Sequence, residues 1–429
     1  MNNVDRRTLL KAGVGGSLLV PLAGCIDPAE TLSDLYTDRE EDTIRVTQEI
    51  DSRKLRSLQM RFKWRSMYTD KTGTVKTFTE SELTKNDDTY TAELSKEQIF
   101  ENIPTEEPVH IELESTLGDY TKTSSNDRYY MLKYQADGTT HTVDRDTVEN
   151  SYSQEDHSYK VSTLHQWETD DTIHFKILYI SGMDWLDIRT RRRRETYSPD
   201  EFYPFLFTLS IPKEKQQALD EYRESLSMIS WREFQQEVSI LDETFHYYEQ
   251  DMVTDFATQI KTQLNNYGIT KEGADIKLLT GFFYEFIDYD YGGMRNPEYN
   301  LRFFSQILED EECICRGTSF GLASVAYQLG YDVGLQALVE VNKYDFPGAY
   351  HMEPTIVFED TPEELEKLYE QNIAYSKPDE IINGISSDVT HNVIYPGRAV
   401  GWSETRKANE AGTKKMEVNR VQFDYLAQA

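Results

Sequence analysis

The chain has 429 residues, which is enough for two domains that each bury a core. Its 76 Asp and Glu residues outnumber its 45 Lys and Arg residues, and the formal net charge of −31 argues against nucleic acid as a partner. Aromatic residues make up 12% of the chain, a content that argues against disorder. We interpret the acidity as halophilic adaptation, since high surface charge keeps a protein soluble.

The first residues predict export and lipid attachment. Arg6 and Arg7 lie in DRRTLLK, which resembles a twin-arginine export motif, and residues 22–25 (LAGC) resemble a lipobox after a short apolar run. We therefore expect a signal peptide over 1–25, a lipid on Cys25, an acidic tether over 26–42 and an extracytoplasmic, membrane-anchored protein. A transmembrane anchor is the competing interpretation, but the apolar run is short and interrupted by glycines.

Residues 43–212 predict a β-rich domain. Apolar residues alternate with polar ones in several short segments, which favours an antiparallel sandwich-like fold. The segments are marked by Ile44, Val46, Ile50, Leu58, Met60, Phe62, Trp64, Val109, Ile111, Leu113, Ile173, Phe175, Ile177, Tyr179, Phe205, Phe207 and Leu209. The histidines of this half are scattered along the sequence, and we expect each to be hydrogen-bonded or solvated: His110, His141, His157, His165 and His174.

Residues 188–195 (IRTRRRRE) form a dense basic block, with Arg191–Arg194 at its centre. Clustered arginines favour contact with anionic lipid headgroups. A solvated hairpin, or an internal partner for carboxylates, is the simpler alternative.

A helical pattern begins at Lys213, directly after Pro212. One apolar stripe holds Leu219, Tyr222, Leu226 and Ile229, and a second holds Val253, Phe256, Ile260 and Leu264. A third helix is expected over 271–287. The acidic residues 288–293 that follow lack the regular ligand spacing of a calcium loop, so no metal is expected there.

A further helix is predicted from Cys315, with Gly330 as its C-terminal stop. A thiol at a helix N-terminus meets the positive end of the helix dipole, which favours the thiolate. Alternation over 333–341 predicts a strand, 342–350 a turn, and His351 the head of a second strand. A cysteine with a histidine elsewhere in the chain is the pattern of a nucleophile and its base.

Four segments carry a resemblance to a known family: 283–289 (FYEFIDY), 303–308 (FFSQIL), 315–333 and His351-Met352. They are similar to the transglutaminase-like (papain-fold) superfamily in its archaeal and bacterial branch. The resemblance implies a papain-like α+β domain over 213–429, with its core at about 245–400, following the β-rich domain. It also implies no cofactor and a peptide or protein substrate.

The resemblance assigns roles to three residues. Cys315 would attack an acyl carbon to form a thioester, and His351 would act as general base. The family places a carboxylate at the head of the next strand, so Asp388 would orient the imidazole, with Glu359 and Asp360 as alternatives. The intervening residues 363–387 are expected to form an acidic helix and a loop. Hydrolysis is favoured over cross-linking because water is the default acceptor at an open thioester. His391 is a rival base, and the backbone N–H of Cys315 would donate to the oxyanion.

The chain departs from the family at both flanks of Cys315. The family's Gly-Asp is Cys313-Ile314 here, and its Glu-Asp is Arg316-Gly317. Glu285 stands where the family tends to have Gln. These departures support an alternative function, a catalytically inactive domain that serves as a surface binding or assembly module. Zinc held by Cys313, Cys315 and His351, a redox pair of the two thiols, and a buried inert thiol are further alternatives; the oligomeric state stays open.

Overall fold

The structure is a computed structural model that describes residues 36–39, 42–50, 57–153, 158–182, 202–226, 250–270, 274–290, 302–340, 350–357, 384–388, 393–397, 406–407 and 417–426. Arg6, Arg7, Cys25 and the basic block 188–195 lie outside these residues. The chain divides into two compact units. The first takes residues 1–61, 76–94 and 113–124, and the second takes 62–75, 95–112 and 125–429.

The first unit contains a four-stranded sheet in the order β1-β2-β6-β5. Its strands are β1 (Tyr36–Arg39), β2 (Thr43–Glu49), β6 (Thr89–Ser95) and β5 (Thr84–Asn86). Alternate residues of β2 and β6 are buried, as the period-two pattern predicts. Strand β1 lies inside the segment 26–42 that was expected to be a tether, because it pairs with β2 from Tyr36 to Arg39.

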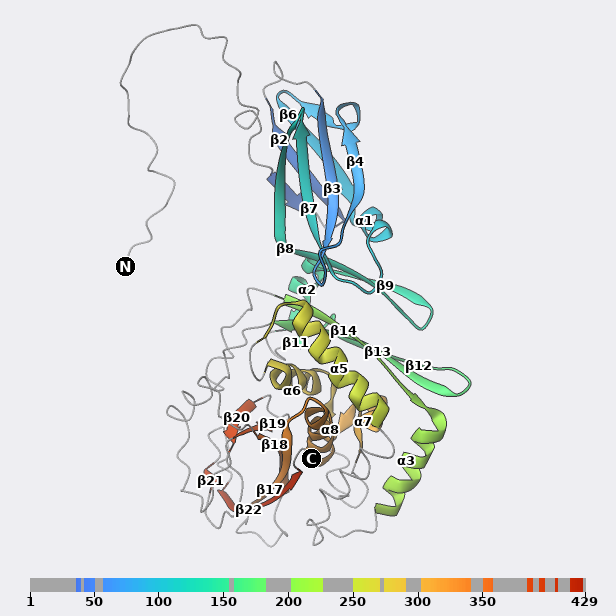
Figure 1. The fold of residues 1–429 in the computed structure, drawn as a ribbon, viewed down its shortest axis with the longest axis vertical. Helices are drawn as coiled ribbons and strands as arrows, with labels where there is room; N and C mark the ends of the chain where they lie inside the picture. The colour runs from blue at the N-terminus through green and yellow to red at the C-terminus, as the bar shows by residue number, and fades with distance from the viewer. Residues whose placement is uncertain are drawn as a thin grey trace, which may run out of the picture. The chain divides into compact units, whose positions relative to one another are not determined.

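A five-stranded sheet runs in the order β4-β3-β7-β8-β9. Its strands are β4 (Thr72–Thr79), β3 (Leu58–Ser66), β7 (Val109–Leu117), β8 (Tyr120–Ala136) and β9 (Thr139–Asp144). Strands β3, β4, β7 and β8 each contribute residues to both units. Figure 1 shows β3, β7 and β8 as long neighbouring arrows. Strand β7 has the alternating burial that its sequence predicts.

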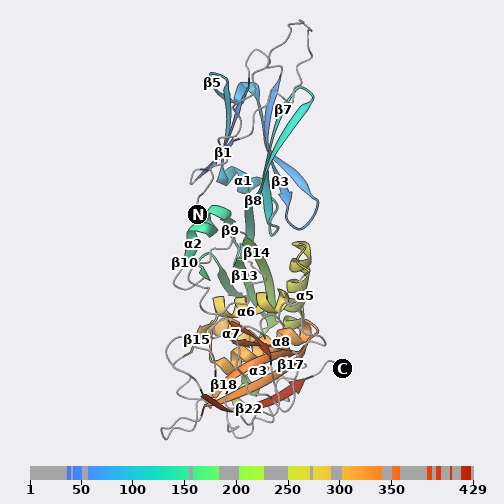
Figure 2. The ribbon, with the colours of Figure 1, turned by 90° about the vertical axis from the view of Figure 1, so that its left-hand side faces the viewer.

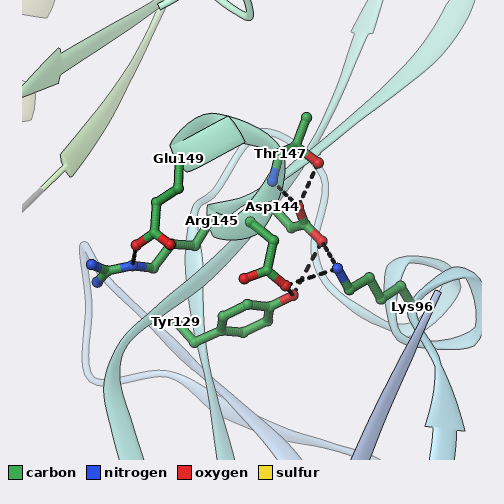
Figure 3. A network of polar contacts seen from close by, with 7 residues as sticks. Lys96, Tyr129, Asp144, Arg145, Thr147 and Glu149 are labelled. Atoms are coloured by element: carbon green, nitrogen blue, oxygen red, sulfur yellow. Dashed lines mark hydrogen bonds and ion pairs between the residues drawn. The ribbon is translucent and has the colours of Figure 1, made fainter. Parts of the chain in front are cut away.

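Two short helices of the second unit share a buried polar network (Figure 3). Lys96 of α1 (Lys96–Asn102) donates to Asp144 at 2.7 Å and to Asp146 of α2 (Arg145–Ser151) at 2.9 Å. The Tyr129 hydroxyl also donates to both carboxylates, at 3.1 and 3.2 Å. Asp144 in turn caps α2 by accepting the backbone N–H of Thr147 at 2.8 Å. The network therefore ties α1 and α2 to β8.

The second unit also contains an antiparallel sheet in the order β12-β13-β14, in which β13 and β14 have buried residues on both faces. Its strands are β12 (Thr163–Glu168), β13 (Thr172–Gly182) and β14 (Phe202–Pro212). One face, which includes Phe175 and Phe207, joins the core that the helices form. The other face, which includes Leu178 and Leu206, packs against Leu132 and its neighbours on β8 and β9. Burial of both faces explains the nearly continuous apolar runs of β13 and β14.

Three helices pack against this sheet: α3 (Lys213–Leu226), α5 (Gln250–Asn266) and α6 (Ala274–Phe286). Helices α7 (Phe304–Asp310) and α8 (Cys315–Gln328) complete the same core (Figure 2). Helix α3 begins at Lys213, as predicted. The expected stripe of α5 is buried, and α5 is followed by Gly268 at a positive φ of 69°. Ile229, the last residue of the other stripe, lies outside the described residues.

A six-stranded sheet in the order β20-β19-β18-β17-β22-β21 packs against α8 through β17 and β18. Its strands are β17 (Asp332–Glu340), β18 (Tyr350–Val357), β19 (Gly384–Asp388), β20 (Val393–Gly397), β21 (Arg406–Lys407) and β22 (Glu417–Leu426). Residues 384–387 were expected to belong to a loop, but they form β19 because they pair with β18 and β20.

The described chain is thus a mixture of helices and antiparallel sheets, an α+β protein. The expected division between residues 212 and 213 does not separate two cores, because Phe175 and Phe207 before it share one cluster with Phe256 and Phe282 after it. Within the described residues, no helix combines the length and apolar character needed to cross a bilayer.

Candidate functional site

Helix α8 begins at Cys315, as the sequence predicts. Ile314 precedes it in an extended conformation, and its carbonyl accepts the Thr318 N–H at 3.2 Å and the Thr318 hydroxyl at 2.8 Å. No side chain among the described residues caps this end through Ile314. The N–H groups of the first turn therefore remain directed away from the helix, at its positive end. The side chain of Cys315 itself lies outside the described part.

Helix α8 is buried more completely than an amphipathic stripe predicts. Every residue from 317 to 326 is buried, including polar Ser319 and Ser324. The reason is that α5, α6 and α7 contact the helix as well as β17 and β18. The Ser324 hydroxyl is satisfied by the Phe320 carbonyl at 2.8 Å. A helix surrounded in this way holds its first residue in a fixed place.

The topology returns His351 toward the start of α8. Three residues, including Gly330 at a φ of 94°, connect α8 to β17, so this strand runs back along the helix that it contacts. His351 on β18 pairs with Leu338 of β17. Leu338 lies about 20 Å along β17 from Asp332, and Cys315 lies about 20 Å along α8 from Gln328. The backbones of Cys315 and His351 thus reach the same end of this layer.

The strand register adds a constraint on the imidazole. Val333 pairs with Ile356 and belongs to the core that contains α8. Alternate positions of a strand belong to opposite faces of the sheet. His351 is an odd number of residues from Ile356, so its register position is on the face opposite Val333. The side chain of His351 lies outside the described part, and its hydrogen bond with Cys315 stays a prediction.

Asp388 ends β19, whereas the resemblance placed it at the head of a strand. Thr355 of β18 pairs with Ser386, so Asp388 lies toward the same end of the sheet as His351 and at a position of the same face. The two residues therefore occupy neighbouring strands. Glu359, Asp360 and His391, the alternatives, lie outside the described residues, as does the side chain of Asp388.

The two departures from the family pattern are linked by packing. Cys313 is a buried cysteine outside any disulfide of the described residues, directly before the Ile314 cap. A Cβ added at Gly317 would overlap the Cys313 sulfur and would lie 3.0 Å from the Arg302 carbonyl oxygen. The Cys313 side chain thus fills the space that a side chain at 317 would need. Neither substitution is independent of the other.

Arg302 fixes the segment that leads into α8. Its guanidinium contacts Asp310 at 2.8 Å, and Asp290 and Glu312 at 3.5 Å each. Asp290 also donates its N–H to the Cys313 carbonyl at 3.0 Å, beside the short parallel pair of β15 (Asp288–Tyr289) and β16 (Glu312–Cys313). The sequence analysis missed Arg302. The only available signal was a lone arginine among acidic residues close to the cysteine.

Two other predicted features of the site are a candidate zinc site and Glu285. Among the described residues, no group of three or more His, Cys, Asp or Glu side chains is arranged to hold a metal ion. The zinc alternative needs the side chains of Cys315 and His351, which are outside that set. Glu285 lies in α6, and its charge helps to raise the pKa of the Tyr179 hydroxyl, although burial is the larger cause.

Three of the histidines that look scattered in sequence lie on β9, β12 and β13. The rings of His141 and His165 are 4.4 Å apart, and the Tyr134 hydroxyl lies 3.2 Å from His165 Nε2. Burial, then the neighbouring His141, lowers the pKa of His165. His174 stacks on Trp167 with ring centroids 5.2 Å apart. His165 and His174 each have a hydrogen-bond partner, as expected.

Comparison with known proteins does not assign this site. No protein-family model matches the chain, and no curated protein matches it. A crystal structure of S. aureus TarS aligns at 11% identity and a TM-score of 0.18, over 41% of this chain and 35% of that chain. A TM-score this low carries no argument about fold or function.

Proposed function

We propose that this chain is a cell-surface lipoprotein with a transglutaminase-like domain of papain type, formed by residues after 212 together with β13 and β14, which share their core. The domain follows a sandwich-like β-rich region and carries out cysteine-dependent acyl chemistry on peptide or amide bonds. The observation that supports this proposal is backbone placement. Helix α8 begins at Cys315, and β18 brings His351 back to the same end of the layer.

The chemistry follows from these groups. The Cys315 sulfur attacks the acyl carbon while His351 takes the thiol proton and passes it to the departing amine. Water then attacks the thioester, which releases the acid and returns the proton to the sulfur. The backbone N–H of Cys315, at the positive end of α8, donates to the oxyanion. Asp388 orients the imidazole from the neighbouring strand.

The test is alkylation by iodoacetamide at neutral pH, with each cysteine read out by peptide mass spectrometry. We expect Cys315 to react in the folded chain because a neighbouring imidazole and a helix N-terminus lower a thiol pKa. His351→Ala should slow this reaction about tenfold or more. Cys313→Ala is the matched control and should leave it unchanged. An unreactive Cys315, or equal rates with and without His351, would reject the enzyme.

A second function, a catalytically inactive surface binding or assembly module, is favoured by one specific observation. The register gives His351 a position on the face opposite Val333, and the residues flanking Cys315 differ from the family pattern. For this function, Cys315 stays unreactive while Cys315→Ser leaves folding and cell-surface assembly unchanged. The same alkylation experiment therefore separates the two functions.

Anchoring at the membrane is a separate proposal that rests on Arg6, Arg7 and Cys25. Cys25→Ser should move the chain from the membrane fraction to the soluble fraction after cell lysis. Replacing both arginines with lysine should retain the precursor inside the cell. A chain that fractionates with the membrane in both variants would contradict lipid anchoring.

A further inference from the structure

Strand β14 forms one edge of its three-stranded sheet, with β13 as its partner on the other side. The N–H and C=O groups of an edge strand need partners, and an unprotected edge is a template for pairing with another chain. Three consecutive edge positions of β14 are Pro204, Leu206 and Thr208. Side chains of α5 (Gln250–Asn266) and of Tyr267, the residue after it, satisfy these three positions.

Two glutamines of α5 each bind one residue of this edge with both ends of the amide. Gln263 accepts the Leu206 N–H at 2.9 Å and donates to the Leu206 carbonyl at 2.8 Å. Gln259 accepts the Thr208 N–H at 2.9 Å and donates to the Thr208 carbonyl at 2.7 Å. Each glutamine thus reproduces the donor and acceptor that a residue of a neighbouring strand would offer.

The third position matches its partner in a different way. Pro204 has no N–H to satisfy, so a donor alone is sufficient. The hydroxyl of Tyr267, which is the next residue in the same spacing, donates to the Pro204 carbonyl at 2.5 Å. Each glutamine amide, which has a donor and an acceptor, lies opposite a residue that has both an N–H and a C=O. The tyrosine hydroxyl, which acts as a donor, lies opposite the proline. Side-chain chemistry therefore matches the edge position by position.

The spacing of the two elements also matches. Residues 259, 263 and 267 are four apart, which is a step of about 6 Å along a helix. Residues 208, 206 and 204 are two apart, which is a step of about 6.6 Å along a strand. The helical side chains therefore stay in register with alternate residues of the strand over three consecutive contacts.

We propose that α5 acts as a strand substitute that blocks the β14 edge against pairing with a second copy of this chain. The occupant follows from the segment itself. Residues 205–211 (FLFTLSI), between the two prolines of β14, are mostly apolar or β-branched and contain neither charge nor proline. Such a segment pairs readily with an identical segment when its edge is open. The two glutamines close that edge by hydrogen bonding, Gln263 at a buried position and Gln259 at a partly exposed one.

Gln259→Leu tests the local contact, because it removes both hydrogen bonds to Thr208 and leaves Gln263 and Tyr267 in place. We expect the β14 amides to exchange at least tenfold faster in a hydrogen–deuterium experiment on the full chain, read from peptides that cover 202–212. Gln217→Leu on α3 is the control, since Gln217 bonds only to Glu221 of its own helix among the described residues. Unchanged exchange in Gln259→Leu would overturn the proposal.

The Gln259→Leu/Gln263→Leu variant tests whether a second copy of the chain pairs with β14 when its edge is open. We expect its mass by light scattering to rise to about twice that of the unmodified chain, with β14 amides protected again in the larger species. A variant that keeps its circular dichroism spectrum and its original mass would overturn pairing between copies. If the double variant loses its fold, the mass of Gln259→Leu at rising protein concentration decides the same question.

Discussion

At the scale of single residues, Gly317 is explained by a neighbour rather than by its own conformation. It lies inside α8, where glycine costs stability relative to alanine. Glycine is nevertheless required at 317, because the Cys313 sulfur occupies the space that a side chain there would need. The sequence alone presents two unrelated departures from a family pattern. The structure joins them into one packing solution at the start of the candidate nucleophile's helix.

This packing predicts a coupling between the two positions. Gly317→Ala should lower the free energy of unfolding by about 1–3 kcal/mol through overpacking. In a Cys313→Ala background, Gly317→Ala should lower the free energy of unfolding by less, and the coupling energy between the two positions should be about 1 kcal/mol or more. Urea unfolding of the four chains measures the cycle. The control combines Gly330→Ala with Cys313→Ala. These positions are distant, so their effects on the free energy of unfolding should be additive within about 0.5 kcal/mol.

Lys96 holds two carboxylates in the network of Figure 3. Its side chain is 11% exposed and that of Asp144 is 4% exposed, so removing one partner leaves buried charge uncompensated. We expect Lys96→Met to lower the free energy of unfolding by about 3 kcal/mol at pH 7. Arg145→Met should cost less than about 1 kcal/mol, since its partner Glu149 is 42% exposed.

The Lys96 effect should depend on pH with a defined sign. Burial acts to raise the pKa of Asp144, but hydrogen bonds from Lys96 and Thr147 outweigh it, so the pKa is lower than usual. A lowered carboxyl pKa contributes stability above the unfolded value, and this contribution is lost as the pH falls through the folded value. The difference between wild type and Lys96→Met should therefore shrink below about pH 4. A constant difference would contradict this assignment.

At the scale of elements, the sequence predicts a boundary best where a hydrophobic pattern ends at a proline or a glycine. Pro212 is the last residue of β14 and α3 begins at Lys213, because proline is tolerated on an edge strand and its fixed φ suits the entry to a helix. Helix α8 is bounded as predicted by Cys315 and Gly330. Both positions follow from local backbone chemistry, which a single sequence contains.

Elements that depend on distant contacts were not predictable in the same way. Strand β1 and the residues of β19 before Asp388 have weak patterns of their own, and they are strands because β2, β18 and β20 pair with them. Gln259 and Gln263 read as ordinary polar residues of a helix. Their spacing acquires meaning only once β14 is known to lie beside them.

The start of α6 and the end of α8 are joined by one hydrogen bond. Tyr331 donates to Asp275 at 2.8 Å. Burial raises the pKa of Asp275, and the hydrogen bonds from Tyr331 and from backbone N–H groups only partly offset this effect. A raised carboxyl pKa means that the charged form costs stability, so stability falls as the pH rises through the folded value. The Tyr331 hydroxyl reduces that cost.

Tyr331→Phe should therefore lower the free energy of unfolding by about 2 kcal/mol at pH 7, as expected for a hydrogen bond to a charged group. In an Asp275→Asn background the same change should cost about 1 kcal/mol, because the acceptor is then neutral. Asp275→Asn alone should raise the Tm at pH 7, and the gain should disappear below about pH 4. Equal costs in both backgrounds would contradict this account.

At the scale of the whole molecule, the excess of 31 negative charges opposes the compact state through mutual repulsion. Screening should relieve it. We expect the Tm to increase as NaCl rises from about 0.1 M to about 1 M, over which the Debye length falls from about 10 Å to about 3 Å. Differential scanning calorimetry at fixed pH measures the change. A Tm that stays constant over this range would show that the charges are already compensated locally.

The burial of β13 and β14 on both faces limits how this protein can be divided. A recombinant fragment beginning at residue 213 would lack β13 and β14, whose Phe175 and Phe207 pack against the helices. The apolar helix residues that they cover would then be exposed to water. The segment that contains Cys315 is thus inseparable from strands that precede residue 213. Any exchange of this segment between proteins, by engineering or by gene fusion, would have to carry residues 163–212 with it.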